Sequence, residues 1–301
     1  MRRMHTSDTP SVPVPRALLF GASGPIGRRV LERLLAHGWA VTALSREMQT
    51  AREGVDWRRG GFPDTIGESA GFDAILSCGP LDLFSHWYAD TSTGAARVVA
   101  FGSTSVHVKA DSPDAAERDL AERLREGEAR VSQAARARGA VVTVLRPTLV
   151  YGGGGDRSLS RIAALARRHG FFPLPDDALG LRQPVHVDDL ADAALAALAR
   201  AGGGARAYDL PGGETLSYRE MVARTLATLD PPARPWLLPA PLFALAVAAA
   251  RLCGLHDAGP AMLARMRQDL AFDDVPARRE LGYVPRGFEP DAGMFGTGDA
   301  G

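Results

Sequence analysis

Short apolar runs alternate with helical patterns through the first half of the chain. Apolar runs of strand length predict strands at Ala17–Phe20, Ala40–Leu44, Ala74–Ser77, Arg97–Phe101 and Val141–Leu145. Helical periodicity between them predicts helices at Pro25–His37, Leu83–Thr93 and Pro113–Arg138, the last one capped by Ser112. Strands and helices that alternate in this way are typical of a doubly wound parallel sheet, so the expected fold class is α/β.

Beyond Pro147 this rhythm loosens. The pattern predicts helices at Ser158–His169 and Asp189–Arg200, a strand at Arg206–Leu210, and a helix opened by the capping box Ser217–Glu220. The segment Trp236–Leu255 is rich in Leu and Ala and predicts a docking helix. Its uninterrupted apolar run, 242–250, is too short for a membrane span, which needs about 20 apolar residues.

Three glycines at three-residue spacing stand between the first predicted strand and the first predicted helix. Gly21 permits a tight turn, Gly24 lets the backbone approach a pyrophosphate, and Gly27 lets the helix pack close to the strand. This arrangement predicts a dinucleotide-binding loop, with a purely structural turn as the alternative. The loop residues expected at the cofactor are Gly21, Ser23, Gly24, Pro25, Ile26 and Gly27.

The end of the second predicted strand indicates which dinucleotide binds. NAD-binding folds place an acidic residue there for the ribose 2′-hydroxyl, but this strand ends in Ser45 and Arg46. Serine and arginine suit a 2′-phosphate, because a guanidinium forms paired hydrogen bonds with phosphate oxygens. We therefore expect NADP, with NAD as the other possibility and a plain surface arginine as the alternative reading of Arg46.

Composition adds mainly exclusions. The chain has 35 Lys and Arg against 35 Asp and Glu, so nothing favours nucleic acid as a partner. Its two cysteines, Cys78 and Cys253, are far apart and show no metal-ligand spacing, which favours reduced thiols in a cytoplasmic protein without a metal site. The expected partner is a small-molecule substrate, and the sequence leaves the oligomeric state open.

Several later segments strengthen one resemblance. Phe101–His107, Leu145–Gly152, Gln183–Ala191, Tyr208–Ser217 and Leu281–Pro285 resemble consecutive elements of the extended, atypical branch of the short-chain dehydrogenase/reductase superfamily, the NAD-dependent epimerase/dehydratase-like proteins. The resemblance implies a Rossmann core at 16–150 and a smaller C-terminal substrate lobe at 151–290 with elements that return to the core. Residues 1–15 and 291–301 are expected to be disordered tails. The family resemblance also implies that Cys78 and Gly79 contact the cofactor.

The chain departs from that family at the catalytic pair. Active members carry Tyr-x-x-x-Lys on the helix after the fifth strand, where one match here gives Leu120 and Leu124 and a shift of one residue gives Ala121 and Arg125. Lys109 is the only lysine in the chain, and Ser105 stands four residues before it, so the pair exists nowhere. The family's Gly-Asp-x-x-Asp segment reads Gly60-Gly-Phe-Pro-Asp64, and Ser77-Cys-Gly-Pro80 replaces a His-rich turn.

Three residues are the catalytic candidates that remain. Ser103 matches the family's usual hydroxyl position, His107 stands where epimerases often have a tyrosine, and Tyr151 comes from the opposite wall. Each has a plainer alternative: Ser103 as a cap at a strand end, His107 as an exposed loop residue, and Tyr151 as a packing or substrate-binding residue. His186 and Asp188 are expected to pin a turn and cap a helix.

Two functions follow. One is an NADP(H)-dependent oxidoreductase or isomerase, of the nucleotide-sugar epimerase/dehydratase type, that uses a substitute acid–base group on a small substrate. The other is a non-catalytic NADP(H)-binding accessory, regulatory or redox-sensing protein.

Overall fold

The structure is a computed structural model that describes residues 13–62, 71–154, 158–252 and 260–295. Only the backbone is described for 250–252 and 260–262. Residues 1–12 and 296–301, most of the two predicted tails, lie outside the described residues, as does Cys253.

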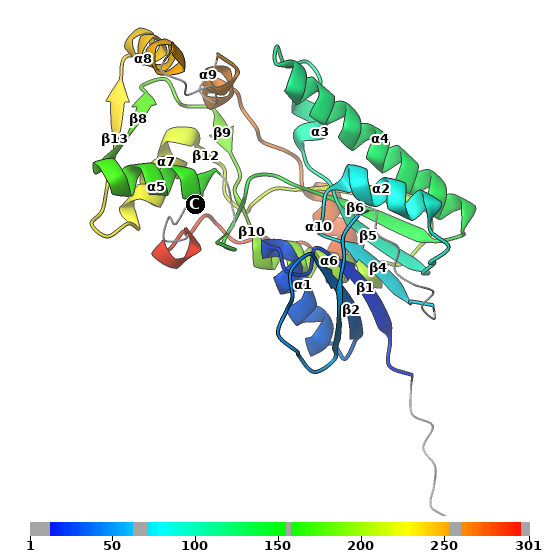
Figure 1. The fold of residues 1–301 in the computed structure, drawn as a ribbon. Coiled ribbons are helices and arrows are strands. Elements are labelled where there is room, and N and C mark those ends of the chain that lie inside the picture. The colour runs from blue at the N-terminus through cyan, green and yellow to red at the C-terminus, as the bar shows by residue number, and fades with distance from the viewer. Residues whose placement is uncertain (1–12, 63–70, 155–157, 253–259, 296–301) are drawn as a thin grey trace, which may run out of the picture.

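In the described part of the chain, the central sheet has seven strands, all parallel (Figure 1). Across the sheet they are β11 (Ala205–Leu210), β6 (Val141–Pro147), β5 (Arg97–Phe101), β4 (Ala74–Ser77), β1 (Arg16–Phe20), β2 (Ala40–Ser45) and β3 (Val55–Arg59). The winding direction changes between β1 and β4, and ligands of such folds bind outside the carboxyl ends of the strands at this point. The predicted doubly wound sheet is confirmed.

Helices cover both faces of the sheet. On one face α1 (Pro25–Ala36), α6 (Val187–Ala199) and α10 (Val275–Leu281) pack against residues such as Leu19, and on the other α2 (Leu81–Asp90) and α4 (Ala115–Ala137) pack against residues such as Leu18. Neighbouring residues of a strand point to opposite faces, so the continuous apolar runs of the sequence serve two cores.

A smaller lobe with its own core follows β6. It contains α5 (Leu159–His169), β8 (Phe171–Pro175), α7 (Tyr218–Ala227), β13 (Arg234–Leu238), α8 (Ala240–Leu252), α9 (Pro260–Arg267) and the 3₁₀ turn η1 (Ala292–Met294). Two short strand pairs, β7 (Val150–Tyr151) with β10 (Val185–His186) and β9 (Leu181–Arg182) with β12 (Leu216–Ser217), lie between this lobe and the sheet (Figure 1). After this lobe begins, α6, β11 and α10 return to the sheet.

The predicted element types hold in the first half, with shifts of a few residues at the ends. The clearest shift concerns α4, which Asp114 caps by accepting a hydrogen bond from the Ala116 N–H at 2.8 Å. The predicted cap at Ser112 is therefore wrong. The Ser112 hydroxyl instead accepts from the Asp114 N–H and donates to Glu117, so it braces the turn that leads into the helix.

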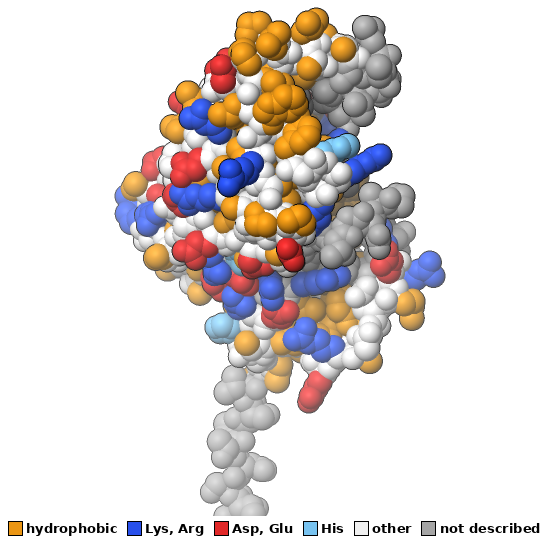
Figure 2. Space-filling view, turned by 90° about the vertical axis from the view of Figure 1, so that its left-hand side faces the viewer, with side chains coloured by type: hydrophobic (Ala, Val, Ile, Leu, Met, Phe, Trp, Pro, Cys, Tyr) orange, Lys and Arg blue, Asp and Glu red, His pale blue; other side chains and the backbone are white. Residues whose placement is uncertain are grey.

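Two predictions for the C-terminal half need correction. Trp236 to Leu238 belong to β13, because they pair in parallel with β8, and only the later part of the predicted docking segment forms α8. Hydrophobic side chains gather over β13 and α8 at the top of the face in Figure 2, with Trp236 and Leu245 among the exposed ones. The disordered tail predicted from 291 is wrong for 291–295, since Phe295 is buried in the core of the smaller lobe.

Among the described residues, no helix is both long and apolar enough to cross a membrane. The described parts of the apolar helices α6 and α8 have 13 residues each.

Candidate active site

The glycine loop lies at the carboxyl end of β1. Gly21 has a φ of +71°, which glycine adopts without strain, and a Cβ at Gly27 would lie 2.0 Å from the Gly21 carbonyl oxygen. No side chain caps α1 at Gly24. The first N–H groups of a helix lack partners within the helix, so this uncapped end can receive an anion such as a pyrophosphate. Ile26 belongs to this first turn.

Polar groups stand where β2 ends. The Ser45 hydroxyl donates to the Ser23 hydroxyl at 3.3 Å, which ties the end of β2 to the glycine loop. Arg46 follows it, is exposed, and makes no hydrogen bond or ion pair with any described residue. Two hydroxyls and one guanidinium thus lie at the edge where a ribose 2′-substituent is bound in folds of this kind.

Cys78 and Gly79 follow β4 and face the same loop. A Cβ built on Gly21 would lie 3.0 Å from the Cys78 carbonyl carbon and 3.1 Å from the Gly79 nitrogen. Cys78 also lines a cleft of about 180 Å³ with Gly24, Pro25, Ile26 and Tyr151. Burial raises the pKa of the Cys78 thiol, so the group stays protonated and acts as a wall of the cleft, not as a nucleophile.

A cluster of aromatic rings lies beside the turn that follows β4. Phe62 stacks on Phe20 with ring centroids 4.7 Å apart, and Trp87 packs on Phe20 at 4.5 Å. A Cβ on Gly79 would lie 3.1 Å from the Phe62 ring. The segment in which the family's first aspartate is missing therefore contributes an aromatic ring next to the cleft.

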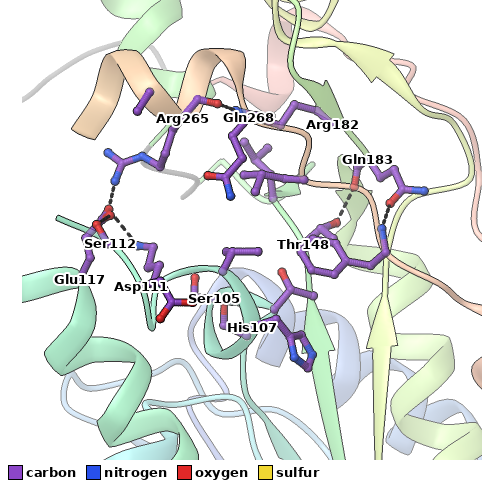
Figure 3. A pocket seen from close by; sticks show the side chains of 18 of the residues that line it. Ser105, His107, Asp111, Ser112, Glu117, Thr148, Arg182, Gln183, Arg265 and Gln268 are labelled. Atoms are coloured by element: carbon purple, nitrogen blue, oxygen red, sulfur yellow. Dashed lines mark hydrogen bonds and ion pairs between the residues drawn. The ribbon is translucent and has the colours of Figure 1, made fainter. Parts of the chain in front are cut away.

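A larger cavity of about 470 Å³ opens between the sheet and the smaller lobe (Figure 3). Its floor comes from the segment after β5, including Ser103 and the short helix α3 (Ser105–Val108). Figure 3 shows Ser112, Glu117 and Arg265 together at one end of the cavity and Thr148 and Gln183 at the other. The first end is therefore charged, and at the other end hydroxyl and amide groups lie beside Arg182.

The structure places Ser103 in the cavity wall. Its hydroxyl oxygen accepts a hydrogen bond from the Ser105 N–H at 3.1 Å, and its own proton remains available to donate. The neighbouring Thr104 hydroxyl donates to the buried Pro147 carbonyl oxygen at 3.2 Å, which fixes this turn to β6. Ser103 thus both caps the turn and presents a donor to the cavity.

His107 lies at the rim of the cavity, with its ring directed away from Arg265 and Gln268 (Figure 3). Its Nε2 atom lies 3.0 Å from an Asp209 carboxylate oxygen and 3.3 Å from the Arg146 guanidinium. Glu128 holds the other side of that guanidinium. Nε2 is therefore engaged by charged neighbours, which leaves Nδ1 as the nitrogen that is not held in this network.

Tyr151 is buried on β7 and lines the smaller cleft. Its hydroxyl donates to the Gly287 carbonyl oxygen at 3.0 Å, and its ring packs edge-on against His186 and Phe288. Burial raises the pKa of the Tyr151 phenol. The geometry therefore favours the packing alternative for this residue, because its only proton is already donated to the backbone.

His186 and Asp188 lie as expected at the start of α6. The His186 Nδ1 atom accepts from the Asp188 N–H at 3.2 Å, which makes His186 the helix cap, and Asp188 pairs with Arg29 and Arg33 of α1. These contacts join α1 to α6. The prediction that the two residues pin a turn and cap a helix is confirmed.

Comparison with known proteins agrees with this geometry. Residues 79–210 match the NAD dependent epimerase/dehydratase family. That segment runs from the turn after β4 to the end of β11 and includes the cavity floor. The family is one of epimerases and dehydratases, which are enzymes, and the resemblance inferred from the sequence motifs is confirmed. No curated protein is similar enough to the chain to match it.

Solved structures share the fold along nearly the whole chain. MoeE5, solved in complex with UDP-glucose and NAD, is 20% identical and superimposes with a TM-score of 0.65 over 91% of this chain and 94% of its own. TunA, an NAD dependent NDP-hexosamine 5,6-dehydratase, is 19% identical with a TM-score of 0.66, covering 91% and 93%. A UDP-galactose 4-epimerase is 14% identical with a TM-score of 0.67, covering 91% and 94%.

The two leucines that the sequence match sets against the family's Tyr–Lys pair lie in apolar surroundings. Both Leu120 and Leu124 lie on α4 and pack in the core under the sheet, and Leu124 is buried. The helix is formed and packed against the sheet, and these two side chains give it no proton donor.

Sequence reasoning missed the charged end of the cavity. Lys109, Glu117 and Arg265 line that end, and Arg182 lines the cavity near Gln183. Burial lowers the pKa of Lys109, Arg182 and Arg265. The available signal was compositional, because a single lysine in a chain so rich in arginine stands beside the segment that resembles the catalytic strand end.

Proposed function

We propose that this protein is an NADP(H)-dependent oxidoreductase or isomerase that acts on a small substrate bound in the larger cavity. The observation that carries the proposal is the adjacency of two sites at one edge of the sheet. The uncapped glycine loop suits a dinucleotide, and the segment with Ser103 begins the neighbouring cavity. When bound, the nicotinamide group supplies hydride transfer.

NADP is the proposed cofactor even though the similar structures are complexes with NAD. Ser23, Ser45 and Arg46 support a 2′-phosphate, and no acidic residue ends β2. A charge-assisted hydrogen bond contributes about 1.5–3 kcal/mol, which corresponds to roughly 10- to 100-fold in affinity.

Calorimetric titration with NADPH and NADH tests this preference. We expect NADPH to bind more tightly, and Arg46→Ala to remove most of the difference. Arg206→Ala, an exposed arginine at the far edge of the sheet, is the matched control and should leave both dissociation constants unchanged. Equal affinities for the two cofactors in the parent protein would refute the assignment.

Ser103 is proposed to orient the reacting oxygen of the substrate. The sequence predicts His107 and Tyr151 as candidate proton donors. The Tyr151 hydroxyl already donates to a backbone carbonyl oxygen, whereas His107 keeps its Nδ1 atom outside the network around Nε2, so His107 is the better candidate of the two. Nucleotide sugars are the first substrate class to screen, followed by aldehydes and quinones. Ser103→Ala, His107→Gln and Tyr151→Phe, compared on the substrate that is found, rank the three residues.

A non-catalytic dinucleotide-binding role is the second candidate. Leu120 and Leu124 in place of the Tyr–Lys pair favour it. Tight NADP(H) binding with no turnover across the whole screen would support this role over the enzymatic one.

A further inference from the structure

Lys109 occupies an unusual place for the only lysine of the chain. It follows the single turn of α3, its N–H donates to the Ser105 carbonyl oxygen at 3.1 Å, and its side chain lines the larger cavity. The ammonium group is mostly withdrawn from solvent, with 24% of the side chain exposed. A strongly hydrated cation is costly to keep in such a position unless it has a partner.

The partner is a carboxylate on α4. The Lys109 Nζ atom lies 3.6 Å from Glu117 Oε1, and Glu117 also accepts a hydrogen bond from the Ser112 hydroxyl at 2.7 Å and pairs with Arg265 of α9. One partly buried carboxylate is therefore shared by two cations at the charged end of the cavity (Figure 3).

Every charged group around Lys109 bears on its protonation. Burial lowers the pKa of Lys109, as does Arg265, whereas Asp114 at the start of α4 raises it. Glu117 is paired with the ammonium group, and Asp111 also lines the cavity. The net direction of the pKa shift is downward, which makes it easier for the ammonium group to release a proton.

The location of the pair matches the missing catalytic group. Glu117 precedes Leu120 by three residues on α4, so the two side chains are neighbours on one face of the helix. Leu120 is the position at which the sequence match places the family's tyrosine. The Lys109–Glu117 pair thus stands one helical turn from the position that the sequence match gives to the family's tyrosine.

We propose that Lys109, held by Glu117, exchanges a proton with the substrate oxygen in this cavity in place of the missing tyrosine. This inference rests on the proposed function. In the step an N–H bond of the ammonium breaks and an O–H bond forms on the substrate. The amine is left neutral and regains its proton from water, so no oxidant or reductant is consumed. The reverse direction removes the proton from a hydroxyl.

The single lysine makes a direct titration possible. Reductive methylation of the full chain with ¹³C-formaldehyde labels one side-chain amine, and Lys109→Arg identifies its signal by NMR. We expect its titration midpoint to lie at least one pH unit below that of the same signal in urea-unfolded protein. Glu117→Gln should lower the midpoint further, because it removes a carboxylate that favours the ammonium form. A folded-state midpoint equal to or above the unfolded value would overturn the proposal.

Kinetics provide the second readout once a substrate is known. General acid–base catalysis contributes about 100-fold or more, so Lys109→Met and Lys109→Arg should both lower kcat by at least about that factor with NADPH affinity unchanged. The arginine variant keeps the charge but cannot release a proton near neutral pH. Activity within threefold of the parent in Lys109→Arg would assign the residue to charge alone and overturn the proposal. If no substrate turns over, the proposed function fails, while the NMR titration still decides whether Lys109 is set up as a donor.

Discussion

Gly24 and Gly27 are three residues apart in one loop, but the space available for an added Cβ differs between them. A Cβ on Gly24 would lie 3.3 Å from the Gly21 carbonyl oxygen, which is tight but open on the cleft side. A Cβ on Gly27 would lie 2.0 Å from the same oxygen, which α1 can accommodate only by moving away from β1. One glycine leaves room for a ligand, and the other leaves room for the fold.

Substitution at the two positions should therefore separate binding from stability. Gly24→Val is expected to abolish dinucleotide binding in titration calorimetry while thermal unfolding changes little, because the added atoms fill the space of the pyrophosphate. Gly27→Ala is expected to lower the free energy of unfolding by about 1–3 kcal/mol, the usual cost of overpacking. Unchanged affinity in a folded Gly24→Val variant would contradict a cofactor role for the loop.

At the residue scale, the sequence anticipated positions better than partners. The Ser103 position and the capping role of His186 followed from local pattern and resemblance. The engagement of His107 by Asp209, 102 residues away, and of Tyr151 by Gly287, 136 residues away, depends on the three-dimensional meeting of distant segments. Residue types alone do not reveal such contacts, so they could not rank the candidate donors.

At the scale of elements, α6 depends on an unusual cap. The His186 ring accepts the Asp188 N–H through Nδ1, which requires a neutral imidazole with a free lone pair. Burial, followed by the charge of Arg286, lowers the pKa of His186 below its ordinary value of 6.5, although Asp188 and Asp189 oppose this. In acid the unfolded chain takes up the proton before the folded one does, so this contribution to stability is present above about pH 6.5 and lost as the pH falls through the lower folded value.

Urea unfolding at pH 7.5 and 5.5 measures this dependence. The parent protein should lose stability on acidification, and His186→Asn, which keeps a capping oxygen but does not titrate, should lose about 1 kcal/mol less over the same interval. An identical pH dependence in the two proteins would show that the cap does not titrate with the fold.

The sequence missed two kinds of element: a strand with few apolar residues, and a strand that forms only because another strand pairs with it. The strand β3 reads Val-Asp-Trp-Arg-Arg and lies at the edge of the sheet, where one neighbour and partial exposure relax the need for an apolar run. Trp236 to Leu238 form a strand because β8 is beside them, and no local signal distinguishes this from the start of the helix that follows.

At the scale of the whole molecule, the last described residues fasten the smaller lobe. Arg286 donates its backbone N–H and its Nε–H to the buried carboxylate of Asp189 on α6, at 3.0 and 2.8 Å. Phe288 and Phe295 then enter the core of the smaller lobe, each about 1% exposed. The segment from Arg286 to Phe295 thus links the sheet side of the molecule to the core of the smaller lobe.

Removing a buried ring from the segment 286–295, which closes the smaller lobe, should therefore lower the free energy of unfolding. Phe295→Ala is expected to reduce the free energy of unfolding by about 3 kcal/mol or more, as for other buried Phe-to-Ala changes. Val284→Ala, just before that segment and 81% exposed, is the matched control and should change it by less than about 0.5 kcal/mol. Chemical denaturation of the three proteins measures both values, and similar losses in the two variants would contradict the closing role.

The distribution of indoles gives the molecule two optical reporters. Trp39, Trp57 and Trp87 belong to the sheet half, whereas Trp236, the fourth tryptophan, lies alone in the smaller lobe with 53% of its surface exposed. The buried indole of Trp87 should have an emission maximum at a shorter wavelength than the solvent-exposed indole of Trp236. The difference between the spectra of the parent protein and Trp236→Phe therefore gives the emission of the smaller lobe alone. Following that difference during denaturation shows whether the smaller lobe or the sheet half unfolds first, without an added dye.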